Sequence, residues 1–148
     1  MEEENDEIKD LLITSFGYEK SVPDNDLIFD VRHLPYPSKY IIDNLTGLDL
    51  EFQHEFLSNS IVQEQINEIK NRILEFISNK NETITIAIGC KNGKHRSVAV
   101  VEELNKLLCK SLDWEINISH PYIKSKIRGN ENIRERSKNR DRKYGLNF

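Results

Sequence analysis

The chain of 148 residues has only two cysteines, Cys90 and Cys109, and neither lies at metal-ligand spacing from histidines or from the other cysteine. Two cysteines are too few for a disulfide scaffold, and the pattern of a zinc site is missing. The sequence also lacks G-x-x-x-x-G-K-[ST], the pattern with which P-loop hydrolases hold nucleotide phosphates. We therefore expect no metal, no cofactor and no hydrolysis of nucleoside triphosphates.

Long apolar runs are missing as well. No stretch approaches the roughly 20 apolar residues that a membrane-spanning helix requires. The first residues, MEEENDE, are acidic, which is the opposite of the basic start of a signal peptide. We expect a cytoplasmic protein with no membrane partner.

The net charge of −4 conceals two regions of opposite sign. Residues 124–143 contain nine basic and three acidic side chains, whereas the rest of the chain contains 12 basic and 22 acidic ones. Basic side chains release counterions from a phosphate backbone, which predicts RNA binding, although a solvated chain end explains the charge equally well. Pairing of this segment with the acidic body of a second copy would give a homo-oligomer. The candidate RNA-binding residues are Lys124, Lys126, Arg128, Arg134, Arg136, Lys138, Arg140, Arg142 and Lys143.

The apolar pattern divides the chain into an acidic, flexible N-terminus (1–10), one domain (11–122) and a basic tail (123–148). Apolar and β-branched runs predict strands at 11–14, 27–31, 84–88 and 114–119, and helical spacing predicts helices at 60–78 and 96–110. Strands that alternate with helices are typical of a parallel sheet. We predict a single three-layer α/β domain with a mainly parallel sheet flanked by helices.

A polar segment joins the strand predicted at 84–88 to the helix predicted at 96–110. The first N–H groups of a helix have no intrahelical partner and lie at the positive end of the helix dipole. A basic segment with a glycine at that place predicts an anion site, with a phosphorylated small molecule as its ligand. The candidate binding residues are Lys91, Asn92, Gly93, Lys94, His95, Arg96 and Ser97.

Asp30 and Arg32 follow the strand predicted at 27–31. In open α/β sheets, polar residues at the carboxyl ends of strands face the ligand crevice. We therefore expect Asp30 and Arg32 to line the same site.

The spacing of Cys90 and Arg96, C-x5-R, suggests a second function. Cysteine-dependent phosphatases use this spacing: loop amides and the arginine hold the phosphate, and a thiolate attacks phosphorus. Gly89 stands where such enzymes usually carry histidine, and only Asp30 and Asp49 are candidates to protonate a leaving group. In the simpler interpretation Cys90 is a small buried residue, and Gly93 supplies a turn.

Three segments closely resemble the C-terminal domain of the RapZ family of bacterial RNase adapter proteins. They are ITSFGYEKSVPDNDLIFDVRHLPYP (13–37), LTGLD (45–49) and TIAIGCKNGKHRSVAV (85–100). The family also has an N-terminal kinase-like half, so we expect here a stand-alone copy of the C-terminal half. The resemblance implies an α/β fold, a phosphosugar site, RNA binding and a ribonuclease partner, without catalysis.

The resemblance also implies roles for particular residues. Asp30 and Arg32 match the family's DVR motif, and residues 91–97 match its basic loop, in which Arg96 would hold a phosphate and Asp30 a sugar hydroxyl or amine. The sequence departs from the family pattern at Ser38 and at His120-Pro121-Tyr122, where a basic residue is missing.

Overall fold

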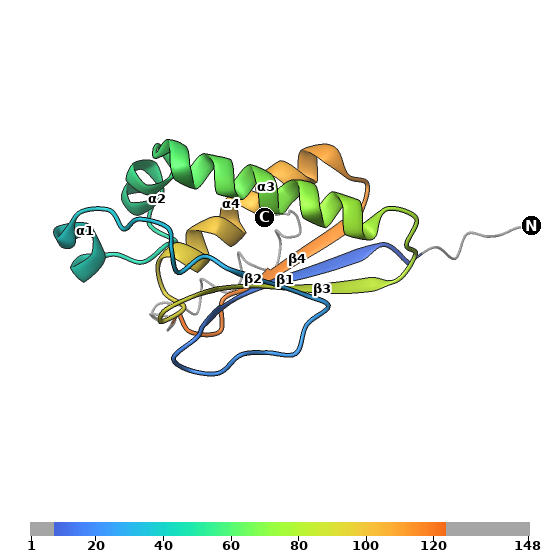
Figure 1. Ribbon diagram of the computed structural model, residues 1–148, viewed down its shortest axis with the longest axis horizontal. Helices are drawn as coiled ribbons and strands as arrows, with labels where there is room; N and C mark the ends of the chain where they lie inside the picture. The colour runs from blue at the N-terminus through green and yellow to red at the C-terminus, as the bar shows by residue number, and fades with distance from the viewer. Residues whose placement is uncertain (1–7, 124–148) are drawn as a thin grey trace, which may run out of the picture.

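A computed structural model describes residues 8–123 of the protein. It contains four strands and four helices, shown in Figure 1. The strands are β1 (Asp10–Gly17), β2 (Leu27–Asp30), β3 (Thr83–Cys90) and β4 (Glu115–Ser119), and the helices are α1 (Lys39–Asn44), α2 (Leu50–Leu57), α3 (Ser60–Ile77) and α4 (Arg96–Ser111).

All four strands are parallel and lie in the order β2-β3-β1-β4. The chain crosses from β1 to β2 in one direction and from β2 to β3 and β3 to β4 in the other. Because parallel crossovers are right-handed, a reversal of direction moves the connection to the opposite face. The two crossovers that contain helices therefore share one face, and the segment 18–26 crosses the other, as Figure 1 shows. We call this second side the helix-free face.

Alternation along the strands separates residues of the two faces. In β1, Leu11, Ile13 and Ser15 point to the helices and are fully buried. Leu12, between them, is 37% exposed on the helix-free face. The helices therefore cover the face of the sheet that forms the core. The segment 18–26 leaves the other face partly exposed.

Helices α3 and α4 supply the other half of the core. The apolar stripe predicted for the first of these helices is buried, at Val62, Ile66, Ile69, Ile73 and Ile77. The Asn59 side chain accepts hydrogen bonds from two backbone N–H groups of the first turn, which explains why α3 begins at residue 60. Helix α4 contacts β1, β3 and β4 directly.

The predicted α/β fold with a mainly parallel sheet is confirmed, and the helices that accompany the sheet lie on one of its faces. The layer opposite the helices is the irregular segment 18–26. Strand β3 runs two residues beyond the predicted 84–88, to Cys90, and the six-residue helix α1 was not predicted. Within residues 8–123, no helix combines the length and apolarity needed to cross a membrane.

Candidate functional site

The candidate site lies at the edge of the sheet where β1, β2 and β3 end. The basic loop, which we define as residues 91–95, joins β3 to α4. The chain leaving β1 runs beside this loop, because Tyr18 N–H donates to the Cys90 carbonyl (2.8 Å) and Glu19 N–H donates to the Lys91 carbonyl (3.0 Å). The chain leaving β2 is held in the same way, by a 2.8 Å bond from Val31 N–H to the Gly89 carbonyl. The two flanking segments thus hold the strand end and the start of the loop in place.

Glycines allow the neighbouring chains to approach the basic loop closely. Gly93 has φ of 78°, a conformation that side chains disfavour. A Cβ atom at Gly17 would lie 2.4 Å from a backbone carbon of the loop. On the other side, Gly47 N–H donates to the Lys94 carbonyl (2.8 Å), and a Cβ atom at Gly47 would lie 2.3 Å from the His95 carbonyl oxygen. The LTGLD turn and the end of β1 therefore hold the loop between them.

The sulfur of Cys90 lies on the inner side of the basic loop. Its Sγ is 3.1 Å from the Ser97 Oγ, and the residue is 1% exposed. Burial alone would raise the pKa of the Cys90 thiol, but hydrogen bonds from the Ser97 hydroxyl and from the backbone N–H groups of Ser97, Gly93 and His95 lower the pKa below its ordinary value. The backbone N–H groups of the loop therefore lie around the sulfur of Cys90.

The guanidinium of Arg96 is directed toward the chain that follows β2. It donates to the carbonyl oxygens of Arg32 and Leu34, the latter at 2.9 Å, and to the Tyr36 hydroxyl at 2.9 Å. Its Cζ also lies 3.8 Å from the centre of the Tyr36 ring. The residue is 5% exposed, and its Nε has no hydrogen-bond partner among the described residues. Arg96 thus joins α4 to the segment after β2, and its cationic group has little surface left for a ligand.

Asp30 and Arg32 form a pair on the helix-free face. Asp30 aligns with Gly89, which aligns with Phe16, so the side chains at these strand positions share that face. Two bonds from Arg32, at 3.0 Å from Nε and 2.7 Å from Nη2, reach the Asp30 carboxylate and lower the pKa of Asp30. The Arg32 guanidinium stacks 3.8 Å from the centre of the Tyr18 ring. Both charged side chains are about half exposed, so a ligand can reach them.

His95 lies on the opposite side of the loop, toward the helices. Its ring stacks on Phe52 of α2, with 5.6 Å between ring centres, and meets the edge of Tyr36. Burial, followed by the nearby charges of Lys94 and Arg96, lowers the pKa of His95, against hydrogen bonds to backbone groups that act in the other direction. His95 is therefore a neutral, packed side chain at pH 7.

Lys91 and Lys94 provide the exposed positive charge of the loop. Lys91 lies 3.8 Å from the Glu19 carboxylate, in a loose and solvated ion pair. Within residues 8–123 the Lys94 ammonium has no ion-pair partner. The predicted residues thus meet at one edge but divide into three sets: exposed cations, the Asp30–Arg32 pair, and side chains that are packed inward.

Comparison with known proteins identifies the family of this chain. The family described as RapZ C-terminal domain matches residues 9–124. The chain belongs to the RapZ C-terminal domain family. A nucleotide-binding protein of Agathobacter rectalis is 38% identical over 137 residues, which are 85% of this chain and 46% of that protein. Nucleotide-binding proteins of Caldicellulosiruptor bescii (38% identity, 80% of this chain, 43% of that protein) and Acinetobacter baylyi (36%, 77% and 42%) are also similar. The chain spans less than half the length of these curated relatives.

Some of the predicted residues of this RapZ C-terminal domain are not described by the structure, and two residues that it places at the site were not predicted. The candidate RNA-binding residues, from Lys124 to Lys143, and the first seven residues lie outside the described part of the chain. Tyr18 and Tyr36, which stack on the two arginines, were not predicted as site residues. In the sequence, Tyr18 is marked only by the preceding Gly17, and Tyr36 only by the prolines on either side of it. Neither feature indicates which arginine the ring contacts.

Proposed function

We propose that this protein binds a phosphorylated small molecule beside the basic loop and acts as a regulator or adapter without catalysis of its own. The observation that carries the proposal is the exposed positive charge of Lys91 and Lys94 at the N-terminus of α4, where the helix dipole also favours an anion. Membership of the RapZ C-terminal domain family supports it, as does the name "nucleotide-binding protein" that the relatives carry.

The three sets of side chains would have different tasks. Lys91, Lys94 and Asn92 would meet the phosphate. The Asp30 carboxylate, which Arg32 keeps ionised, would accept hydrogen bonds from hydroxyl or amine groups, which favours a phosphosugar. Arg96 would act indirectly, by holding the wall that contains Tyr36.

A titration of the whole protein with inorganic phosphate, glucosamine 6-phosphate and glucosamine tests this proposal. We expect the phosphorylated sugar to bind more tightly than phosphate and the unphosphorylated sugar to bind weakly. Lys94→Ala should lower the phosphosugar affinity about tenfold, because it removes one charge-assisted contact. Lys106→Ala, which removes another exposed lysine, on α4 and away from the basic loop, is the matched control and should change nothing. No binding of any phosphorylated compound would refute the proposal.

The RNA-binding part of the proposal depends on the segment 124–148. Nine basic residues would give an RNA affinity that falls steeply with salt concentration, and the complex would be delivered to a ribonuclease. Filter binding at several salt concentrations, with and without residues 124–148, measures this. If the protein with residues 124–148 and the protein without them bind RNA with the same affinity, this segment is not the RNA-binding part.

A cysteine-dependent phosphatase is the alternative, favoured by the position of the Cys90 sulfur beneath the loop amides and beside Ser97. Against it, the sulfur is buried and the Arg96 guanidinium binds protein carbonyls. Hydrolysis of an aryl phosphate that is lost in Cys90→Ser would establish this alternative, and inactivity of the wild-type protein over a broad panel of phosphate esters would reject it.

A further inference from the structure

Three polar side chains outside the proposed site form a hydrogen-bonded chain. The Ser15 Oγ lies 2.8 Å from the His120 Nδ1, and the His120 Nε2 lies 2.8 Å from a carboxylate oxygen of Glu102. The three residues come from β1, from the end of β4 and from α4. Ser15 is fully buried, and the side chains of His120 and Glu102 are 11% and 26% exposed.

The composition of this chain is that of a serine hydrolase triad, but its burial excludes that role. The Ser15 Oγ has no exposed surface, so a substrate cannot reach it. A carboxylate only accepts hydrogen bonds, so the Nε2 of His120 donates to Glu102, while its Nδ1 pairs with the Ser15 hydroxyl. Both ring nitrogens are therefore engaged, and the orientation of His120 is determined by two other elements.

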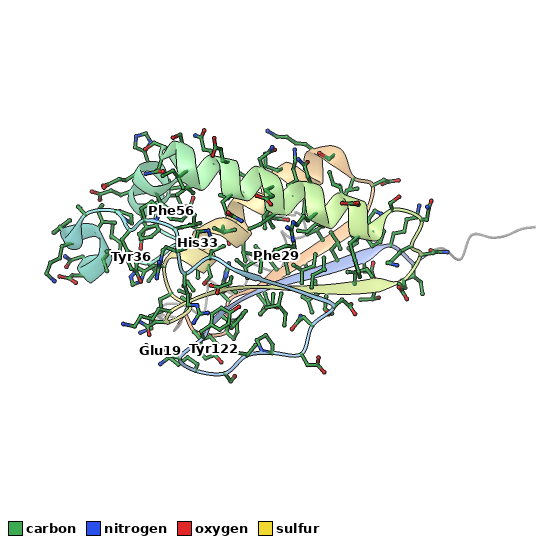
Figure 2. All side chains as sticks on the ribbon, viewed as in Figure 1. Glu19, Phe29, His33, Tyr36, Phe56 and Tyr122 are labelled. Carbon is green, nitrogen blue, oxygen red and sulfur yellow. The ribbon has the colours of Figure 1, made fainter. Side chains whose placement is uncertain are left out.

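The orientation of His120 determines where the next residues lie. The chain turns at 120–123, with Ile123 N–H donating to the His120 carbonyl at 3.2 Å. In this turn a ring carbon of Tyr122 comes within 3.1 Å of the position that a Cβ atom of Gly93 would occupy. The Tyr122 hydroxyl lies 3.4 Å from the Ser21 Oγ, and Figure 2 shows Tyr122 on the helix-free side of the sheet. Tyr122 therefore adjoins the basic loop.

We propose that Tyr122 is a wall of the phosphate site and that the Ser15–His120–Glu102 chain positions it. The separation from Ser21 is long for a bond between hydroxyls, so the Tyr122 hydroxyl can instead donate a hydrogen bond to a phosphate oxygen beside Gly93. Glu102 and His120 are positioning residues, since neither touches the ligand. This inference rests on the proposed function. It adds to the site the segment 120–123, which is distant from the basic loop in sequence.

The test begins with three substitutions in the full chain, each titrated with inorganic phosphate while the amide signal of Gly93 is followed by NMR. Glu102→Leu removes the acceptor for His120 and should weaken phosphate binding about tenfold. Glu102→Gln retains an oxygen that can accept from His120, so its affinity should stay within about twofold of wild type. Glu103→Leu, which changes the adjacent residue of the same helix, is the matched control and should also stay within about twofold.

A double-mutant cycle separates positioning from a general loss of structure. Tyr122→Ala alone should weaken phosphate binding about as much as Glu102→Leu, and the double variant should lose no more than either single variant, because both act through one wall. Tyr122 lies in the turn after β4, outside the sheet, the helices and the buried core, so its substitution tests the wall without removing a core side chain. Additive losses, or wild-type affinity in Tyr122→Ala, would overturn this inference while the proposed function stands. Absence of binding of inorganic phosphate and of every phosphorylated compound by the wild-type protein would overturn both.

Discussion

Arg96 and Arg32 were both expected to bind the ligand. From the structure we expect replacement of Arg96 by methionine to lower the stability of the fold, and replacement of Arg32 by methionine to lower ligand affinity in a folded protein. Methionine keeps much of the volume of the side chain and removes the guanidinium. At position 96 this deletes bonds to two backbone carbonyls and to the Tyr36 hydroxyl. At position 32 it deletes a pair with Asp30 whose partners are about half exposed.

The magnitudes follow from burial. A hydrogen bond from a charged group contributes about 1.5–3 kcal/mol, and a buried carbonyl left without a partner costs about 1–3 kcal/mol. Removing the buried charge of Arg96 relieves part of its desolvation, which offsets some of this loss. We therefore expect Arg96→Met to lower the free energy of unfolding by about 2–4 kcal/mol. Arg32→Met should leave it nearly unchanged, as for exposed ion pairs.

Urea unfolding measures both values, with the fluorescence of the single tryptophan, Trp114, as the signal. Titration with phosphosugar gives the second comparison, in which Arg32→Met should lose affinity while the protein remains folded. Equal stability losses in the two variants would refute the reasoning. So would an Arg96→Met protein that is as stable as wild type and no longer binds the ligand, because Arg96 would then be a ligand contact rather than a structural one.

Three further predictions concern the basic loop and the two cysteines. Gly93→Ala places a side chain at φ of 78° against the end of β1, so we expect a loss of about 1–3 kcal/mol in urea unfolding, and an unchanged midpoint would contradict this conformation. Because the pKa of His95 is lowered, the unfolded chain binds more protons as the pH falls below the ordinary value of 6.5. Unfolding free energy should therefore fall from pH 7 to pH 5, and His95→Phe should reduce this slope; an identical slope would contradict the burial of the ring. Cys109 is exposed and Cys90 is buried, so iodoacetamide should modify Cys109 first, as measured by mass spectrometry. Faster modification of Cys90 would instead favour the phosphatase alternative.

Much of the fold was predictable because its signals are local. Alternation and helical spacing of apolar residues placed the four strands, α3 and α4, and their order along the chain implied a parallel sheet. The six-residue helix α1 was not predicted, because it follows two prolines and has only one buried residue, Ile41. The helix-free face was not predicted either, since it depends on the strand order, which sets the direction of each crossover.

The sequence by itself indicated which residues would lie at one edge of the sheet, because parallel strands bring their carboxyl ends to one edge and a basic segment lies before a helix. Tertiary structure alone decided what each of them does there. Arg96 bonds to carbonyls more than 60 residues earlier in the chain, and Ser15 and His120 are 105 residues apart. Which partner a buried polar group finds depends on the packing of distant segments, because each such group must be satisfied where water is excluded. That is why the spacing of Cys90 and Arg96 suggested a phosphate cradle, whereas the folded chain directs Arg96 to the segment after β2.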